Sequence, residues 1–385
     1  MSSSVYINRA ATFLPGAPVS NDDMENILGT VAGKTSRVRQ KILKSNGIRN
    51  RHYAIDPATH RLTHNNAQLT AEAVRNLRIE NPVLSTLELL CCGTSSPDQI
   101  FPSHASMVHG ELACPPCELA SFSGVCLSGL SAIKYGYVSI LSGLRHQAIA
   151  TGSELASTFM QGKHFTEESE SAIHELEAQP EIAFEKDFLR WMLSDGAGAV
   201  LLNDKPNPSG ISLRIDWIEI LSYANLLPVC MYAGAIKNKD GTLTGWREFN
   251  SYKELGEHSV FAIKQDVKLL NEHVVNITIA KGLQDILEKR ALTPEEIDWF
   301  LPHYSSKFFR QRIYDSLKSI NFEIPDERWY TNLERVGNIG AASIYFMLAE
   351  LLNSEKLSNG DSILCFVPES GRFSTGFMKM TAIYQ

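Results

Sequence analysis

The residue with the clearest chemical potential is Cys126, which lies within the run FSGVCLSG (122–129). Small residues surround the thiol, and a pattern of apolar and small residues at helical spacing continues from Cys126 to Leu144. The cysteine is therefore expected at a helix N-terminus, where free N–H groups and partial positive charge favour the thiolate. Because small neighbours leave space for a substrate, the pattern predicts a nucleophile.

Two later segments offer partners for such a nucleophile. His303 follows the apolar run Trp299–Leu301 and a proline, at the point where a strand ends and a turn begins. Asn338 stands in a glycine-flanked turn that precedes the apolar helical segment Ala341–Leu352. Loops carry function where a scaffold fixes them, and this helix would hold the amide rigidly.

A cysteine, a histidine and an asparagine together suit a condensation reaction. The thiolate takes an acyl group, while the other two donate hydrogen bonds to a second thioester on which charge grows as CO2 leaves. Fixed donors of this kind contribute about 10²–10³ each to rate. A papain-like hydrolase uses the same residue types differently, with histidine as the base and asparagine orienting it. A cysteine α/β-hydrolase is another alternative, although Ser128 replaces the second glycine of its nucleophile elbow.

These residues need a scaffold that joins two parts of the chain. Strand-like and helical segments alternate in both halves, which predicts a mainly parallel α/β architecture. The run KPNPSG (205–210) is the strongest linker signal, so we expect halves at 1–205 and 206–385. Residues 159–188 are expected to form an excursion and 237–253 a polar loop. A long helical pattern covers Val260–Leu283.

Composition limits the function classes. The chain has 385 residues, is 44% hydrophobic and 21% charged, and carries a net charge of −7. This negative net charge gives no indication of nucleic-acid binding, and no apolar run reaches the roughly 20 residues that a membrane span needs. No secretory signal is visible, and seven cysteines fit reduced thiols. We therefore expect a cytoplasmic protein that acts on small molecules and does not bind membranes.

The order of the motifs resembles the thiolase superfamily, and within it the β-ketoacyl synthase III type of condensing enzyme. The similar segments follow one another along most of the chain. They are GIRNR (47–51), TSSPD (94–98) with PS (102–103), Cys126, SDGAGA (194–199), PH (302–303), and NL (332–333) with GNIGAAS (337–343). Each alone is weak, but all of them in the family's order are specific.

The resemblance implies a five-layered α-β-α-β-α fold of two similar halves, usually as a homodimer. It implies that Cys126 is acylated and that His303 and Asn338 promote decarboxylative condensation with a malonyl or β-ketoacyl thioester. The backbone N–H groups of Cys126 and Gly371 would form the oxyanion hole. Substrates would be acyl-CoA or acyl carrier protein thioesters, and no other cofactor is expected.

The chain also departs from the family's pattern. Ser128 replaces a glycine, Gly129 replaces a bulky residue, and Tyr304 begins the changed segment after the histidine. The glycine-rich C-terminal loop is reduced to residues 369–372. These changes touch the acyl pocket, and the pattern resembles ketosynthases of dialkylresorcinol or aryl polyene pathways. The alternative to a condensing enzyme is an acyltransferase of the same fold that forms an ester or amide, although such an enzyme needs no donor pair for an enolate. A third possible class of protein is a non-catalytic subunit of a heterodimer.

Two further patterns complete the sequence-based expectations. Basic side chains at Arg49, Lys307, Arg310 and Arg335 are predicted to edge the tunnel mouth and to meet an acidic carrier protein or a CoA phosphate. Cys114 and Cys117 have CxxC spacing, but no second CxxC or Cys/His pair at metal-ligand spacing accompanies them. We therefore expect no metal site.

Overall fold

The computed structural model describes residues 4–30, 39–78, 84–165 and 189–385 of the chain. Most of the predicted excursion at 159–188 lies outside the described residues. Nine strands form the main sheet. They are β1 (Val5–Phe13), β4 (Leu89–Thr94), β5 (Glu118–Ser123), β6 (Gln147–Glu154), β7 (Gly196–Asn203), β8 (Ile211–Ser222), β13 (Trp299–Pro302), β14 (Ser362–Glu369) and β15 (Ser374–Tyr384).

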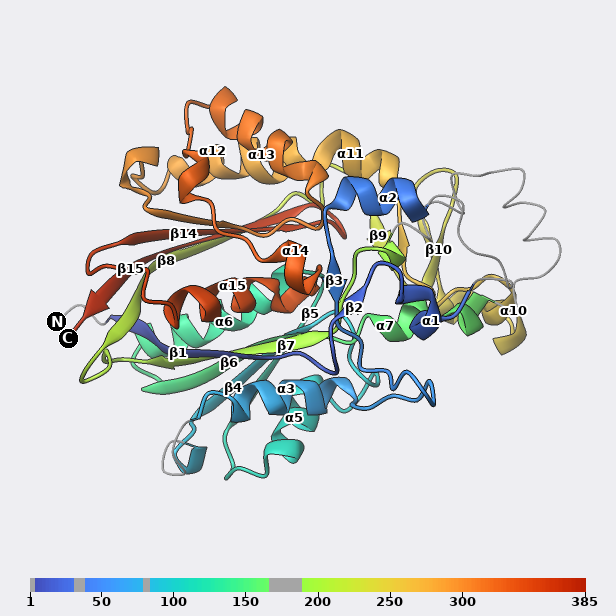
Figure 1. Ribbon diagram of the computed structural model, residues 1–385, viewed down its shortest axis with the longest axis horizontal. Coiled ribbons are helices and arrows are strands. Elements are labelled where there is room, and N and C mark those ends of the chain that lie inside the picture. The colour runs from blue at the N-terminus through green and yellow to red at the C-terminus, as the bar shows by residue number, and fades with distance from the viewer. Residues whose placement is uncertain (1–3, 31–38, 79–83, 166–188) are drawn as a thin grey trace.

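The main sheet consists of two layers that join at one corner. Its strand order is β13-β14-β15-β8-β1-β7-β6-β4-β5. The junction between β1 and β8 pairs only Val5–Ile7 with Leu213–Ile215, so the strands on either side of it diverge. Figure 1 shows them as two separate layers, with β8, β14 and β15 in one and β1, β4, β6 and β7 in the other.

The two layers repeat the same topology. In the first, β4 and β6 are parallel, whereas the pairs β6–β7 and β7–β1 are antiparallel. In the second, β13 and β14 are parallel, whereas β14–β15 and β15–β8 are antiparallel. In the first layer, β5 pairs with β4 in parallel. In the second layer, an isolated parallel bridge between Phe300 of β13 and Trp329 takes the corresponding position. The prediction of two similar halves is confirmed; the boundary between 205 and 206 stays a prediction.

The expectation of a mainly parallel sheet is wrong. Three of the strand pairs named above are parallel, namely β4–β5, β4–β6 and β13–β14, and the other five are antiparallel. The reason is visible between β14 and β15, which a short turn joins into a hairpin. Such a turn returns the chain in the opposite direction, whereas a parallel pair needs a long crossover.

Helices complete five layers, as the family resemblance implied. The central layer contains α6 (Leu127–Leu141) and α15 (Ser343–Leu352), which follows the 3-10 turn η6 (Gly340–Ala342). Figure 1 shows both helices between the two sheet layers, with α3 and α5 below and α11, α12 and α13 above. The outer helices are α3 (Asn66–Arg75), α5 (His104–Leu112), α11 (Val267–Val275), α12 (Gly282–Leu287) and α13 (Phe308–Ser319). None of the helices in the described ranges is long and apolar enough to cross a bilayer.

The central layer packs closely because its contacts are made by small residues. A Cβ atom on Gly129 of α6 would stand 2.1 Å from the Ala341 carbonyl oxygen. A Cβ atom on Gly152 of β6 would stand 2.3 Å from the same oxygen. The Tyr345 hydroxyl of α15 donates a hydrogen bond to the Gly129 carbonyl at 2.8 Å. The departure at Gly129 therefore has a structural reason, because a larger residue would separate the two halves.

Two segments differ from the sequence-based expectation. The long helix predicted over Val260–Leu283 begins only at Val267, because the Asp266 side chain accepts a hydrogen bond from the Leu269 N–H and caps it there. The helical path then continues through the π-helical segment η3 (Asn276–Lys281) into α12. The predicted loop at 237–253 instead contains β11 (Leu243–Gly245), which pairs with β10 (Ala235–Lys237).

The remaining elements are short and lie around the site or at the periphery. They are β2 (Val19–Ser20), α1 (Met24–Leu28), α2 (Arg39–Asn46), β3 (Asn50–Arg51), α7 (Ser157–Met160), η1 (Gly162–Phe165), β9 (Met231–Tyr232), η2 (Trp246–Glu248), α10 (Tyr252–Glu257), β12 (Lys264–Gln265), η4 (Pro294–Glu296), η5 (Asp326–Arg328) and α14 (Leu333–Val336).

Candidate active site

Cys126 lies at the N-terminus of the central helix α6, as predicted. Gly124 has a φ of 147°, a backbone conformation that favours glycine, and this turn carries the chain from β5 into α6. The Ser128 hydroxyl donates to the Val125 carbonyl at 2.9 Å and closes the first helical turn. The serine that replaces the family's glycine therefore holds the turn on which the thiol stands. Cys126 is 7% exposed.

The protonation state of this thiol differs from the expectation. Burial raises the pKa of Cys126 well above its usual range, and the nearby carboxylates of Glu154 and Glu369 raise it further. A helix N-terminus acts in the opposite direction, but its effect is typically worth only about 0.3–1 kcal/mol, up to about 2 when partly buried. The expectation that helix placement alone favours the thiolate is therefore wrong for the pocket without substrate, because desolvation dominates.

His303 follows β13 directly and is buried. Its backbone N–H donates to the Phe366 carbonyl on β14 at 2.8 Å, which extends the parallel pairing of β13 with β14 by one residue. Burial lowers the pKa of the His303 imidazole to about 4. The ring is therefore neutral at pH 7, with one N–H that can donate a hydrogen bond to a substrate.

Asn338 is held at the N-terminal side of the central helix α15. Its backbone N–H donates to the Met192 carbonyl at 3.0 Å, and its own carbonyl accepts from Ser194 N–H at 2.9 Å. The preceding Gly337 has a φ of 76° and ends α14. The side-chain Oδ1 accepts a hydrogen bond from the Gly340 N–H at 3.0 Å. Because Oδ1 is already occupied, Nδ2 is the donor that the amide can offer to a ligand.

Two pockets meet at Cys126. One, the histidine pocket, is lined by Cys126 and His303 together with residues of α11, η3 and α13. The other, the asparagine pocket, is lined by Cys126, Asn338 and Glu154 together with apolar residues. Ser305 and Ser370 line both. The structure therefore brings the three predicted residues to one place, although they come from three distant parts of the chain.

Glu154 is a site residue that the sequence analysis missed. It ends β6, is buried, and lines the asparagine pocket. Its carboxylate accepts hydrogen bonds from the Ser95 hydroxyl at 2.5 Å, the Ser96 hydroxyl at 2.9 Å and the Ala341 N–H at 3.1 Å. Burial raises its pKa to about 7. In the sequence, Glu154 is recognisable only as a glutamate at the end of a buried strand. This pattern indicates a functional residue only when the end of the strand is known to lie at the site.

The predicted oxyanion-hole donor at Gly371 is engaged elsewhere. Gly371 lies beside the segment that carries the nucleophile, since a Cβ atom on it would stand 3.1 Å from Val125 Cγ2. However, its N–H donates to the Glu369 carboxylate at 2.5 Å. Burial raises the pKa of Glu369. An acyl oxygen can use the Gly371 N–H only after this side chain moves.

The four predicted basic residues have different surroundings. The Arg310 Nη1 donates to both carboxylate oxygens of Asp326, at 2.8 and 2.9 Å, and Arg335 pairs with Glu350 at 2.6 Å. Arg49 pairs with Glu334 at 2.5 Å and is largely exposed. Lys307 precedes α13, and its side chain packs against Gly47. Lys307 and Arg49 are both exposed, and each lies beside the turn that contains Gly47.

Known proteins resemble this chain in sequence. Residues 287–377 match the family model of the C-terminal part of 3-oxoacyl-[acyl-carrier-protein] synthase III. The chain is 26% identical over 324 residues to β-ketoacyl-[acyl-carrier-protein] synthase III 2 of Deinococcus radiodurans, covering 84% of this chain and 80% of that protein.

Solved structures share the fold. AbyA1, a tetronic acid condensing enzyme, superposes with a TM-score of 0.74 at 19% identity, covering 98% of this chain and 99% of that one. Xanthomonas campestris OleA with bound lauric acid and lauroyl-CoA gives 0.74 at 18% identity, covering 99% and 100%.

The layered fold and these matches support a condensing enzyme of the thiolase superfamily. Within that superfamily the chain is similar to β-ketoacyl synthase III enzymes, and these matches support a Claisen condensing enzyme.

Proposed function

We propose that the enzyme works in two half-reactions on thioesters, with Cys126 as the acyl carrier between them. The observation that carries this proposal is the position of Cys126, at the junction of a pocket lined by His303 and a pocket lined by Asn338. A nucleophile that served a single hydrolytic step would not need a neutral imidazole and a free amide N–H facing it from two sides.

In the first half-reaction the Cys126 Sγ attacks the carbonyl of an acyl thioester, and the carrier thiol leaves with a proton. The Cys126 N–H is the first donor to the oxygen that becomes negative, and the Gly371 N–H is the second once Glu369 has moved away. Donors fixed where charge develops stabilise it at little reorganisation cost. The product is an acyl-cysteine thioester within the pockets.

In the second half-reaction a malonyl thioester loses CO2 and its enolate carbon attacks the acyl-cysteine carbonyl. The new C–C bond forms as the C–S bond to Cys126 breaks, which regenerates the thiolate. The enolate oxygen needs hydrogen-bond donors, and neutral His303 and the Asn338 amide both supply an N–H. A β-ketoacyl thioester that is deprotonated instead of decarboxylated would use the same two donors.

The acyl group is proposed to be a fatty chain. Leu189, Met192, Leu193, Met231, Ile263 and Leu270 supply apolar walls to the asparagine pocket. Apolar walls favour methylene groups because burying each one contributes about 0.8 kcal/mol. The fold neighbour OleA binds lauroyl-CoA, which supports the same substrate class for this chain.

The carrier is proposed to approach over the surface that holds Lys307 and Arg49. Both side chains are cationic and lie beside the turn at Gly47. Arg49, Arg310 and Arg335 are each paired with a carboxylate, so Lys307 is the main cationic group of this surface. Charge at such a rim mainly raises the association rate with an acidic carrier protein or a CoA phosphate.

The enzyme is proposed to act as a homodimer joined at β5. This strand is at one end of the sheet order and pairs only with β4 among the named strands, so its other edge is unpaired within the part of the chain that the structure describes. An open edge of this kind can pair with the same strand of a second copy. Tyr135, Val138 and Leu141 of α6 are large apolar side chains that are exposed in the single chain.

Intact-mass measurement after incubation with acetyl-, hexanoyl-, octanoyl- and lauroyl-CoA tests the first half-reaction. Wild type should gain the mass of one acyl group, and Cys126→Ala should gain none. A hydrolase would release free acid without a lasting adduct, and an ester- or amide-forming acyltransferase would need an alcohol or amine to turn over. Equal labelling of wild type and Cys126→Ala would refute the proposal.

A further inference from the structure

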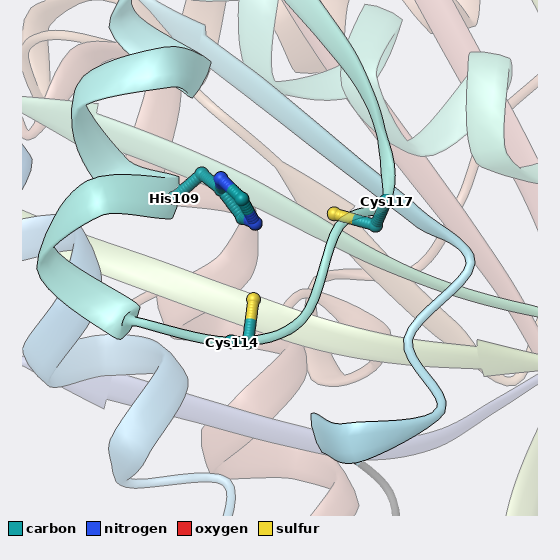
Figure 2. A group of neighbouring side chains, drawn as sticks. All are labelled: His109, Cys114 and Cys117. Atoms are coloured by element: carbon teal, nitrogen blue, oxygen red, sulfur yellow. The ribbon is translucent and has the colours of Figure 1, made fainter.

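A cluster of metal-ligating side chains lies outside the active site, where α5 connects to β5. His109 is in the last turn of α5, Cys114 follows the helix, and Cys117 immediately precedes β5. One potential ligand atom from each side chain lies within 4.8 Å of the other two. Figure 2 shows the imidazole and the two thiols pointing into the same space.

The local backbone explains this convergence. Ala113 adopts the left-handed conformation, with φ 50° and ψ 31°, and its N–H donates to the His109 carbonyl at 3.0 Å, which ends α5. Two prolines then stiffen the connection between the cysteines. The His109 Nε2 lies 3.1 Å from the Pro115 carbonyl oxygen, which keeps the ring over this connection. The turn therefore brings together residues that a straight helix or strand would separate.

The donor set identifies the kind of ion. Two thiolates and an imidazole are a borderline-soft set of the type that binds zinc, and structural or catalytic zinc sites use the same ligand types. In a tetrahedral site the bond lengths of about 2.3 Å to sulfur and 2.0–2.1 Å to nitrogen place ligand atoms about 3.4–3.8 Å apart. If side-chain rotation moves the ligand atoms closer together by about 1 Å, the present cluster reaches that spacing. All three residues are partly exposed, so an ion can enter from solvent.

We propose that His109, Cys114 and Cys117 bind a zinc ion through one imidazole nitrogen and two thiolates, with a fourth position left to water or another donor. The two thiols lose their protons as the metal–sulfur bonds form, so binding one Zn²⁺ releases two protons. If Nε2 is the ligand, its contact with the Pro115 carbonyl gives way and the ring proton resides on Nδ1.

The site would act as a structural clamp on the edge of the sheet. The Glu118 N–H donates to the Glu88 carbonyl at 3.0 Å where β5 begins, directly after Cys117. Strand β5 then leads through Gly124 to Cys126. An ion that ties the start of β5 to α5 therefore limits motion in the segment that presents the nucleophile. The proposal depends on the cluster alone and is independent of the condensation chemistry.

Metal analysis of the full-length chain tests the proposal. The protein is stripped with chelator under reducing conditions and titrated with Zn²⁺ against a chromophoric competitor, and separately with Co²⁺. We expect one Zn²⁺ per chain, a higher melting temperature in its presence, and a thiolate-to-cobalt charge-transfer band. Cys114→Ser and Cys117→Ser should each weaken Zn²⁺ binding at least 100-fold, and His109→Gln at least 10-fold.

Two controls keep the result specific. Cys126→Ser removes a thiol outside the cluster and should bind Zn²⁺ as wild type does, and circular dichroism verifies that each variant is folded. The proposal is overturned if wild type binds no Zn²⁺ above background, or if the double variant C114S/C117S binds as much as wild type. A Cys114–Cys117 disulfide that persists under reductant, seen as a 2 Da loss in intact mass, would also overturn it.

Discussion

The Oε1 atom of Glu154 accepts a hydrogen bond from the Ala341 N–H at 3.1 Å, and this contact joins strand β6 of the first half to the turn that carries Asn338. Gly340 lies against the same carboxylate, since a Cβ atom there would stand 2.8 Å from Oε1. The side chain that fixes the donor turn is therefore also a charge close to the nucleophile. Its protonation should influence both reactivity and stability.

Replacing Glu154 with glutamine should make Cys126 more reactive at alkaline pH. The Glu154 charge raises the pKa of the thiol, so its removal should increase the thiolate fraction, and one pKa unit corresponds to about tenfold. We expect iodoacetamide to label the variant about 3–10-fold faster than wild type at pH 8. The difference should vanish below pH 6, because Glu154 is then neutral in wild type. Glu355→Gln, at an exposed position, should have no effect.

The same substitution should change how stability depends on pH. The pKa of Glu154 is about 7 in the folded protein and about 4.5 when unfolded. Between these values the folded state binds more protons, so the free energy of unfolding falls as pH rises. Urea denaturation from pH 4.5 to 7.5 should show a shallower decline for Glu154→Gln than for wild type. A steeper decline in the variant would contradict the assignment.

Asn338→Ala should separate the two half-reactions. The variant lacks the Nδ2 donor proposed for the enolate but keeps Cys126, so it should still gain an acyl group. Removing a preorganised donor of this kind typically costs about 10²–10³ in rate. Release of CO2 from a malonyl thioester by the acylated protein measures the second step. Equal release by wild type and variant would remove Asn338 from the proposed mechanism.

Gly129→Ala should destabilise the contact between the central helices. The added methyl would stand 2.1 Å from the Ala341 carbonyl oxygen and 3.0 Å from the Tyr345 ring. Overpacking of this kind costs about 1–3 kcal/mol, and the melting temperature should fall accordingly. Gly110→Ala is the matched control, because the same methyl on α5 meets no atom within 4 Å. It should be neutral or stabilise by about 0.5–1 kcal/mol.

Lys307→Glu should slow the reaction with an acyl carrier protein in a salt-dependent way. If the rim attracts an acidic carrier, reversing this charge should lower kcat/KM about 10-fold at low salt and much less at high salt. Lys307 is a sharper probe than Arg310, whose substitution would also break the ion pair with Asp326. The control is Lys356→Glu, at an exposed position after α15. Unchanged kinetics at low salt would rule out this docking surface.

The sequence by itself determined the order of the motifs and the local structure around them. Cys126 was placed at a helix N-terminus because small and apolar residues continue at helical spacing, and Asn338 was placed in a turn because glycines flank it. These signals are short-range, since they depend on neighbouring residues, and the structure has both features. The five layers followed from the resemblance that the ordered motifs carry.

The tertiary structure decided what depends on contacts between distant residues. The raised pKa of the Cys126 thiol follows from its burial and from the nearby carboxylates of Glu154 and Glu369. No local sequence pattern reveals that these two side chains lie close to the thiol. The packing of Tyr345 on Gly129 joins residues from opposite halves, and the turn at Ala113 brings His109 to the cysteines that spacing alone had set aside. Desolvation and close packing arise only when separate segments meet, so they cannot be inferred from a linear order of residues.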